Sequence, residues 1–121
     1  NWRLAARSLR ETSAPGTFTD DDLRRYRRAW DRPGAFEAMV NWYRAIARDR
    51  PRPATARVEV PTLVIWGARD RFLEKRLAGE SVDHCVNGRL HTIDEATHWV
   101  VHEYPHRVAD AIADHVDPMS S

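Results

Sequence analysis

Two residues that could share acid–base chemistry each follow a run of strand-forming residues. Asp70 comes after the apolar run VPTLVIWG, in the stretch ARDRFL, and His98 comes after the run RLHTI, in the stretch DEATHW. A carboxylate that accepts a hydrogen bond from one ring nitrogen fixes the tautomer of an imidazole and leaves its other nitrogen free to take a proton. The pair therefore predicts a general-base site. The structural alternative is that Asp70 caps a turn and His98 is an ordinary loop residue.

A second arrangement of histidines could bind a metal ion. His98 and His102 form an H-x-x-x-H pair, which would place both rings on one face of a helix. The zinc protease motif H-E-x-x-H needs a glutamate directly after the first histidine, and Trp99 stands there instead. Since no third ligand stands out, we expect no metal and no cofactor.

Elements that could position Asp70 and His98 alternate along the second half of the chain. The run at residues 60–67 has the length and β-branching of a strand buried on both faces, and a loop, a helix and a strand over 89–93 follow. Residues 104–116 form an amphipathic pattern with Pro105 in the first turn and with three inward positions, Val108, Ile112 and Val116. This alternation predicts an α/β sheet with Asp70 and His98 beyond the carboxyl ends of adjacent strands.

The first half of the chain is predicted to be entirely helical. A helix ends near residue 12 and is followed by the helix-breaking segment SAPG, and a second helix begins after Thr19, a good N-cap that is followed by three aspartates. The third helix covers residues 35–48 and carries one apolar stripe of Phe36, Met39, Val40, Tyr43 and Ile46. Because a proline-rich polar segment follows, we divide the chain into a helical part, 1–57, and an α/β part, 58–121.

Composition limits the classes of function. The chain has 121 residues, of which 42% are hydrophobic and 31% charged, and its net charge is +1. This balance is typical of a globular protein and gives no sign of a nucleic-acid partner. No apolar run is long enough to span a membrane, no signal peptide is visible, and a single cysteine, Cys85, excludes an internal disulfide. These features favour a cytoplasmic protein, although the first residue is Asn and the parent chain is expected to be longer.

The α/β part resembles the C-terminal portion of the α/β-hydrolase fold family. The resemblance lies in VPTLVIWGARDRFL followed by RLHTIDEATHWVVHEYPHRVADAIADHV. That family arranges its triad in the order nucleophile, acid, histidine, which implies that Asp70 is the acid and His98 the histidine. It also implies that residues 58–118 are the last two strands and helices of the core and that residues 1–50 belong to a helical cap. Thr97 departs from the family pattern, in which many members have glycine before the histidine.

The helical part looks like the cap of epoxide hydrolases and close relatives. In epoxide hydrolases a cap tyrosine in an Asn-Trp-Tyr-Arg stretch helps to polarise the epoxide oxygen, and the matching residue is Tyr43. A phenol can donate a hydrogen bond to the alkoxide that forms when an epoxide opens. The structural alternative is that Tyr43 packs the third helix. Trp66 and Trp99 flank the predicted site and could wall a pocket for a small-molecule substrate, an epoxide or an ester; the structural alternative is that both are core aromatics.

A nucleophile is missing from the sequence. There is no Gly-x-Ser-x-Gly elbow and no equivalent aspartate, and the family places both before the cap. We therefore expect an epoxide hydrolase-like portion of a longer enzyme that is inactive alone and associates with itself or with the upstream portion. Three alternatives stay open: an esterase with a serine nucleophile, a haloacid or haloalkane dehalogenase, and a non-catalytic structural or association unit.

Overall fold

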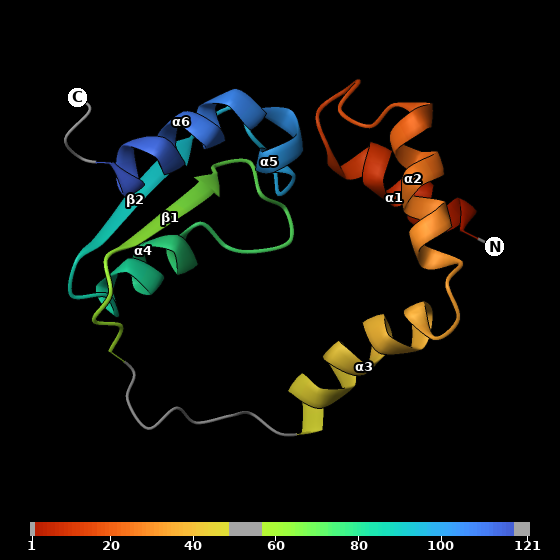
Figure 1. Ribbon diagram of the computed structural model, residues 1–121, viewed down its shortest axis with the longest axis horizontal. Helices are drawn as coiled ribbons and strands as arrows, with labels where there is room; N and C mark the ends of the chain where they lie inside the picture. The colour runs from red at the N-terminus through yellow and green to blue at the C-terminus, as the bar shows by residue number, and fades with distance from the viewer. Residues whose placement is uncertain (1, 49–56, 118–121) are drawn as a thin grey trace.

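The computed structural model describes residues 2–48 and 57–117, and three helices precede an α/β unit (Figure 1). The helical part contains α1 (Arg3–Thr12), α2 (Asp20–Trp30) and α3 (Ala35–Arg48). The α/β unit contains β1 (Thr62–Gly67), α4 (Arg76–Asp83), β2 (Gly88–Ile93), α5 (Val100–Glu103) and α6 (Pro105–Val116). The alternation predicted from the sequence is therefore present, with α5 as an additional short helix. The proposed boundary at 57/58 adjoins residues 49–56, which lie outside the described residues.

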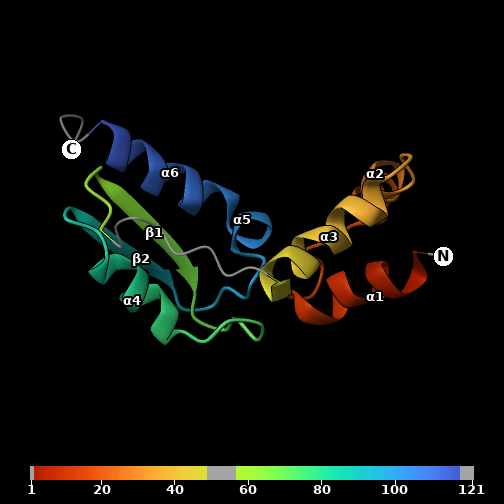
Figure 2. The same ribbon diagram turned by 90° about the horizontal axis from the view of Figure 1, so that it is seen from below.

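A parallel pair of strands forms the centre of the α/β unit. β1 and β2 run side by side with the register Thr62↔Gly88 to Gly67↔Ile93. The helices α4 and α6 lie on opposite faces of this pair, which gives three layers (Figure 2). Because the strands are parallel and in register at Gly67 and Ile93, the loops that follow them leave from the same edge.

The core of the α/β unit is small. Ile93, Ala96 and Val108 are buried, and Ile65 and Tyr104 are among the half-buried side chains that pack against them. Because the core is small, the sequence prediction of three inward positions in α6 is only partly right. Val108 is 6% exposed, as expected of an inward position, but Ile112 is 48% and Val116 75% exposed. A sheet of two strands is narrow and covers only part of the apolar face of α6, because β1 and β2 are the only strands in the described part of the chain.

The burial of β1 also differs from the prediction. A strand buried on both faces was expected, yet positions 62–66 are only half-buried and Gly67 alone is buried. The hydrogen-bonding edge of β1 opposite β2 has no partner strand among the described residues, and two strands give α4 and α6 little surface to cover. β1 therefore consists of residues typical of a fully buried strand, although the described part of the chain buries them only partly.

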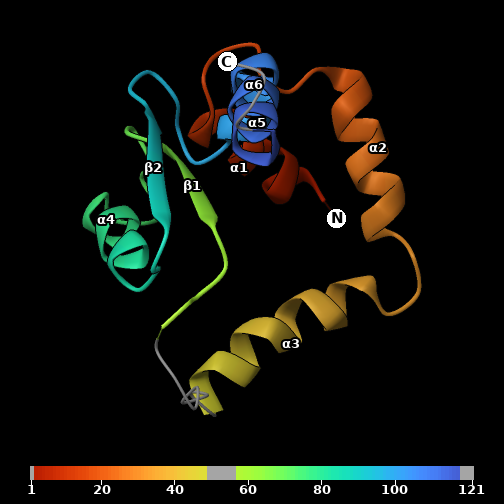
Figure 3. The same ribbon diagram turned by 60° about the vertical axis from the view of Figure 1, so that its left-hand side comes forward.

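The first two helices form a second core that reaches into the α/β unit. Thr19 caps α2 as predicted, since its hydroxyl accepts from the Asp22 amide and the Asp22 carboxylate accepts from the Thr19 amide. A buried cluster holds the helices together, and Trp99 from the α/β unit packs against it. Figure 3 shows α1 next to α5, the helix that Trp99 precedes. The cluster consists of Ala6, Leu9, Phe18 and Leu23.

The third helix is extended away from the first two (Figures 1 and 3). Its predicted stripe exists, but most of it is exposed to solvent: Phe36 is 60%, Met39 46% and Ile46 55% exposed. No side chain of α3 is buried. Within the described residues, no helix combines the length and the apolar character that are needed to cross a membrane.

Candidate active site

Two loops at the carboxyl edge of the sheet carry the site, and backbone contacts hold them together. The Ala68 amide donates to the Ile93 carbonyl at 3.0 Å, and the Arg69 amide donates to the Ala96 carbonyl at 2.9 Å. Gly67 makes this approach possible, because a Cβ there would overlap the backbone carbonyls of the neighbouring loop. The loop of Asp70 and the loop of His98 are thus fixed to each other by the sheet itself.

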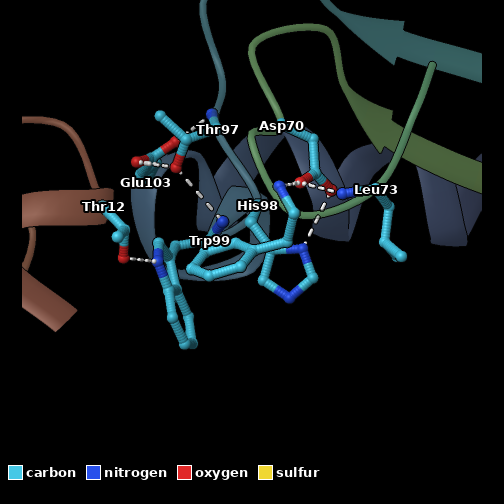
Figure 4. A network of polar contacts seen from close by, with 8 residues as sticks. Thr12, Asp70, Leu73, Thr97, His98, Trp99 and Glu103 are labelled. Carbon is cyan, nitrogen blue, oxygen red and sulfur yellow. Dashed lines mark hydrogen bonds and ion pairs between the residues drawn. The ribbon is translucent and has the colours of Figure 1, made fainter. Parts of the chain in front are cut away.

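Asp70 and His98 form a hydrogen-bonded pair (Figure 4). The distance between His98 Nδ1 and Asp70 Oδ2 is 2.8 Å. The other carboxylate oxygen, Oδ1, accepts from the backbone amides of Phe72 at 2.8 Å and Leu73 at 3.0 Å. The predicted proximity of the two residues is confirmed. The Asp70 side chain is 7% exposed and that of His98 is 36% exposed, so the carboxylate is enclosed and the imidazole is accessible.

Asp70 is held in its ionised form. Burial alone would raise the pKa of Asp70, but the hydrogen bonds from His98 and from the Leu73 and Phe72 amides outweigh it, and the pKa lies below its ordinary value. An ionised carboxylate has no proton to donate, so the proton of this bond belongs to His98 Nδ1. In the neutral ring, Nε2 then carries a lone pair and can accept a proton from a reactant.

An apolar cavity of about 590 Å³ opens beside the imidazole. Tyr43, which is 78% exposed, reaches it from α3. The rings of Trp99 and Phe72 meet the imidazole edge-on, with centroid distances of 5.3 and 5.0 Å. The remaining lining side chains are Ala5, Ser8, Leu9, Trp30 and Leu73. Such a cavity suits a small, largely apolar molecule whose one reactive polar group faces His98 and Tyr43.

The two predicted tryptophans differ in their placement. Trp99 lines the cavity, and its indole Nε1 donates to Thr12 Oγ1 at 2.9 Å, which orients the ring. Trp66 is not among the residues that line this cavity, and its Nε1 is buried without a hydrogen-bond partner in the described part of the chain. The prediction that both tryptophans wall the pocket is therefore right for Trp99 and wrong for Trp66, because alternation along β1 directs successive side chains to opposite faces of the sheet.

The structure pairs His102 with a tyrosine instead of with His98. His102 Nε2 lies 3.0 Å from the Tyr26 hydroxyl, and its ring packs against Phe18 with a centroid distance of 4.9 Å. Among the described residues no cluster of three or more His, Cys, Asp or Glu side chains could hold a metal ion.

Several residues of the site gave no clear signal in the sequence. The Phe72 and Leu73 amides act through the backbone, which residue identity does not reveal. The α1 residues Ala5, Ser8 and Leu9 have the spacing of one helix face, but that spacing cannot indicate which partner the face meets. The Trp99 side chain, which lies between α1 and the imidazole, joins that face to the site.

Comparison with known proteins gives consistent similarities. The sequence profile described as "Alpha/beta hydrolase family" matches residues 1–111. AB hydrolase superfamily protein YfhM of Bacillus subtilis (strain 168) is 44% identical over 102 residues, which are 84% of this chain and 36% of YfhM. Epoxide hydrolase 1 of Caenorhabditis elegans is 34% identical over 96 residues, which are 78% of this chain and 24% of that protein.

Solved structures share the fold. A variant of an epoxide hydrolase from Bacillus megaterium superposes with a TM-score of 0.76 at 21% identity, over 96% of this chain and 43% of the other. The serine hydrolase CarC, involved in carbazole degradation, superposes with a TM-score of 0.75 at 23% identity, over 93% of this chain and 45% of the other. The chain thus spans about a quarter to a third of the length of these curated relatives and less than half of these solved structures.

Proposed function

The chain belongs to the alpha/beta hydrolase family, and on that premise we propose that it supplies the acid and the histidine of an epoxide hydrolase-like active site. The observation that carries the proposal is the bond of 2.8 Å between His98 Nδ1 and Asp70 Oδ2 at the wall of an apolar cavity that Tyr43 also lines. The epoxide hydrolase character draws on the similarity to several epoxide hydrolases, including Epoxide hydrolase 1 of C. elegans. The nucleophile belongs to a part of the enzyme outside these 121 residues, since the sequence has no nucleophile elbow.

In the first step of the proposed reaction, a carboxylate nucleophile attacks an epoxide carbon. The carbon–oxygen bond of the ring breaks, and an alkyl ester to the enzyme forms. The phenol of Tyr43 donates a hydrogen bond to the departing oxygen and protonates it as the negative charge develops. The Tyr43 side chain is 78% exposed on α3, so its hydroxyl is accessible to that oxygen.

In the second step, water hydrolyses the ester. His98 Nε2 takes a proton from the water while the resulting hydroxide adds to the ester carbonyl. Collapse of the adduct expels the alkoxide, which takes the proton of the newly formed carboxylic acid, so that a diol leaves and the carboxylate is regenerated. The proton on His98 then returns through solvent to the Tyr43 phenolate, which restores both side chains. The positive charge that His98 acquires is stabilised by Asp70, whose carboxylate is already ionised and held by two backbone amides.

A chimera tests the proposal directly. The segment of YfhM that matches this chain is replaced by the present sequence, and hydrolysis of styrene oxide, p-nitrophenyl acetate and 1-bromobutane is measured. We expect turnover of the epoxide that His98→Ala abolishes at the ester-hydrolysis step, so that an alkylated enzyme accumulates and is detected by mass spectrometry. Turnover confined to the acetate or to the bromoalkane would show that this acid–histidine pair and Tyr43 do not support epoxide opening beside the YfhM nucleophile, and would contradict the proposal. The 121-residue chain alone, assayed in parallel, is expected to hydrolyse none of them.

A further inference from the structure

Glu103, the last residue of α5, accepts from three donors, two of Thr97 and one of Ala14, and Figure 4 shows the contact with Thr97. Its Oε2 accepts from the Thr97 amide at 2.6 Å, and its Oε1 accepts from the Thr97 hydroxyl at 2.6 Å. Oε1 also accepts from the Ala14 amide at 2.7 Å, in the segment between α1 and α2. All three bonds are part-buried. The Glu103 carboxylate therefore connects the loop that carries His98 to the segment between α1 and α2.

We propose that Glu103 is a positioning residue for His98, an inference that rests on the proposed function of that histidine. Asp70 holds the imidazole, but it does not hold the backbone from which the imidazole extends. Glu103 binds the residue before His98 through the Thr97 amide, which belongs to the peptide between Ala96 and Thr97. The Thr97 hydroxyl, itself bound to Glu103, accepts from the Trp99 amide at 3.3 Å, which restrains the peptide after His98. Glu103 therefore restrains Thr97 directly, and it restrains Trp99 through the Thr97 hydroxyl.

The bond to Ala14 couples this restraint to the helical part. Residues 12–14 meet the histidine loop twice, through the Ala14 amide on Glu103 and through Thr12 Oγ1, which accepts from the Trp99 indole. Hydrogen bonds to a charged acceptor are stronger than those between neutral groups. Docking of α1 and α2, which form one wall of the cavity, therefore helps to set the position of His98, and the wall and the base are assembled together.

The substitution Glu103→Gln tests the role of the carboxylate with little change in size. Glutamine keeps one carbonyl oxygen, but its NH₂ group then faces at least one of the three donors. The matched control is Glu95→Gln, which removes the same charge from an exposed carboxylate that binds Arg107 at 3.2 Å. Both variants are made in the 121-residue chain labelled with ¹⁵N, so that no turnover is needed.

The measurement is the exchange with water of the His98 Nδ1 proton, which the bond to Asp70 protects. We expect exchange to be faster in Glu103→Gln by on the order of tenfold, the effect of leaving one buried donor without a partner, and unchanged in Glu95→Gln. Unchanged exchange in a Glu103→Gln chain whose backbone amide spectrum remains native overturns the proposal. A purely structural role would lower the resistance of that variant to urea without altering the Nδ1 proton in the native state.

A second pair of variants keeps the proposal testable if Glu103→Gln does not fold. Thr97→Val removes only the hydroxyl of the network, whereas Thr97→Ser keeps it. We expect faster exchange in Thr97→Val and the parent value in Thr97→Ser; equal exchange in the two overturns the proposal. Where both single variants fold, their effects should be less than additive, as expected of members of one network. Altered Nδ1 exchange together with an inactive chimera would contradict the proposed function and leave the positioning role intact.

Discussion

The backbone of Thr97 lies so close to Gly67 that not even a methyl group fits between them. Gly67 ends β1 and Thr97 precedes His98, so this contact brings the two site loops together. In Gly67→Ala the new Cβ would meet backbone carbonyls, which cannot swing aside as a flexible side chain can. We expect the free energy of unfolding to fall by about 1–3 kcal/mol and the bond between Asp70 and His98 to be lost.

Gly79 in α4 provides the control for this substitution. A Cβ at Gly79 would meet nothing within 4 Å, and alanine in the interior of a helix is favoured over glycine by about 0.5–1 kcal/mol. Gly79→Ala is therefore expected to raise the free energy of unfolding, measured with urea, while Gly67→Ala lowers it. Changes of the same sign in both variants would contradict the close approach of the two loops.

The stability that Asp70 contributes should depend on pH. Its pKa is lowered in the folded chain, so its contribution is fully present above the ordinary value of 3.8 and is lost as the pH falls from there through the lowered folded pKa. Asp70→Asn is expected to destabilise the chain at pH 7 and to differ less from the parent at pH 3. Urea unfolding at both pH values tests this, with Asp83→Asn at the end of α4 as the control for the loss of one carboxylate.

Tyr43 is predicted to act on ring opening and not on stability. Because its side chain is 78% exposed, Tyr43→Phe should leave the free energy of unfolding nearly unchanged. In the chimera with YfhM, alkylation of the enzyme by styrene oxide should slow by about 10²-fold, the effect of removing one donor to a developing oxyanion. The control is Tyr104→Phe, which alters a tyrosine that packs against the core of the α/β unit. An unchanged alkylation rate in a single turnover would remove Tyr43 from the mechanism.

The exposed apolar surface of the chain predicts self-association. One hydrogen-bonding edge of β1 has no strand beside it in the described part of the chain, and α3 exposes Trp42 and Phe36 by 74% and 60%. An open apolar strand edge is a template for pairing with another chain. Sedimentation velocity of the 121-residue chain should show a sedimentation coefficient that rises with concentration. A single monomeric species across the range would contradict this prediction.

The sequence predicted local structure and the acid–histidine pair well. The family resemblance is confirmed, and the capping of α2 by Thr19 is confirmed because it depends on residues only three positions apart. Asp70 and His98 were found because each follows a strand, and parallel strands place such positions together. Their catalytic roles, and the division of the chain at 57/58, stay predictions.

Predictions that depended on distant partners were less accurate. The periodicity of α6 correctly marks its apolar face, but the exposure of Ile112 and Val116 follows from how much sheet lies beneath that face. Glu103 was missed for the same reason, since its bond to the Ala14 amide joins residues 89 positions apart. A pattern within one element reveals which face is apolar or which residue is a cap, and it does not reveal the partner that this face or side chain meets.

The parallel pairing of β1 and β2 through one short helix has a consequence for how the site forms during folding. The acid and the histidine come from the single continuous segment 62–98, and α4 is the only helix within it. Closing a loop of this length costs little more entropy than closing one half as long, and contacts of moderate sequence separation form early. The acid and the histidine can therefore meet without the helical part, whereas the cavity wall and the Glu103 contact that positions His98 are complete only when Ala14 reaches Glu103.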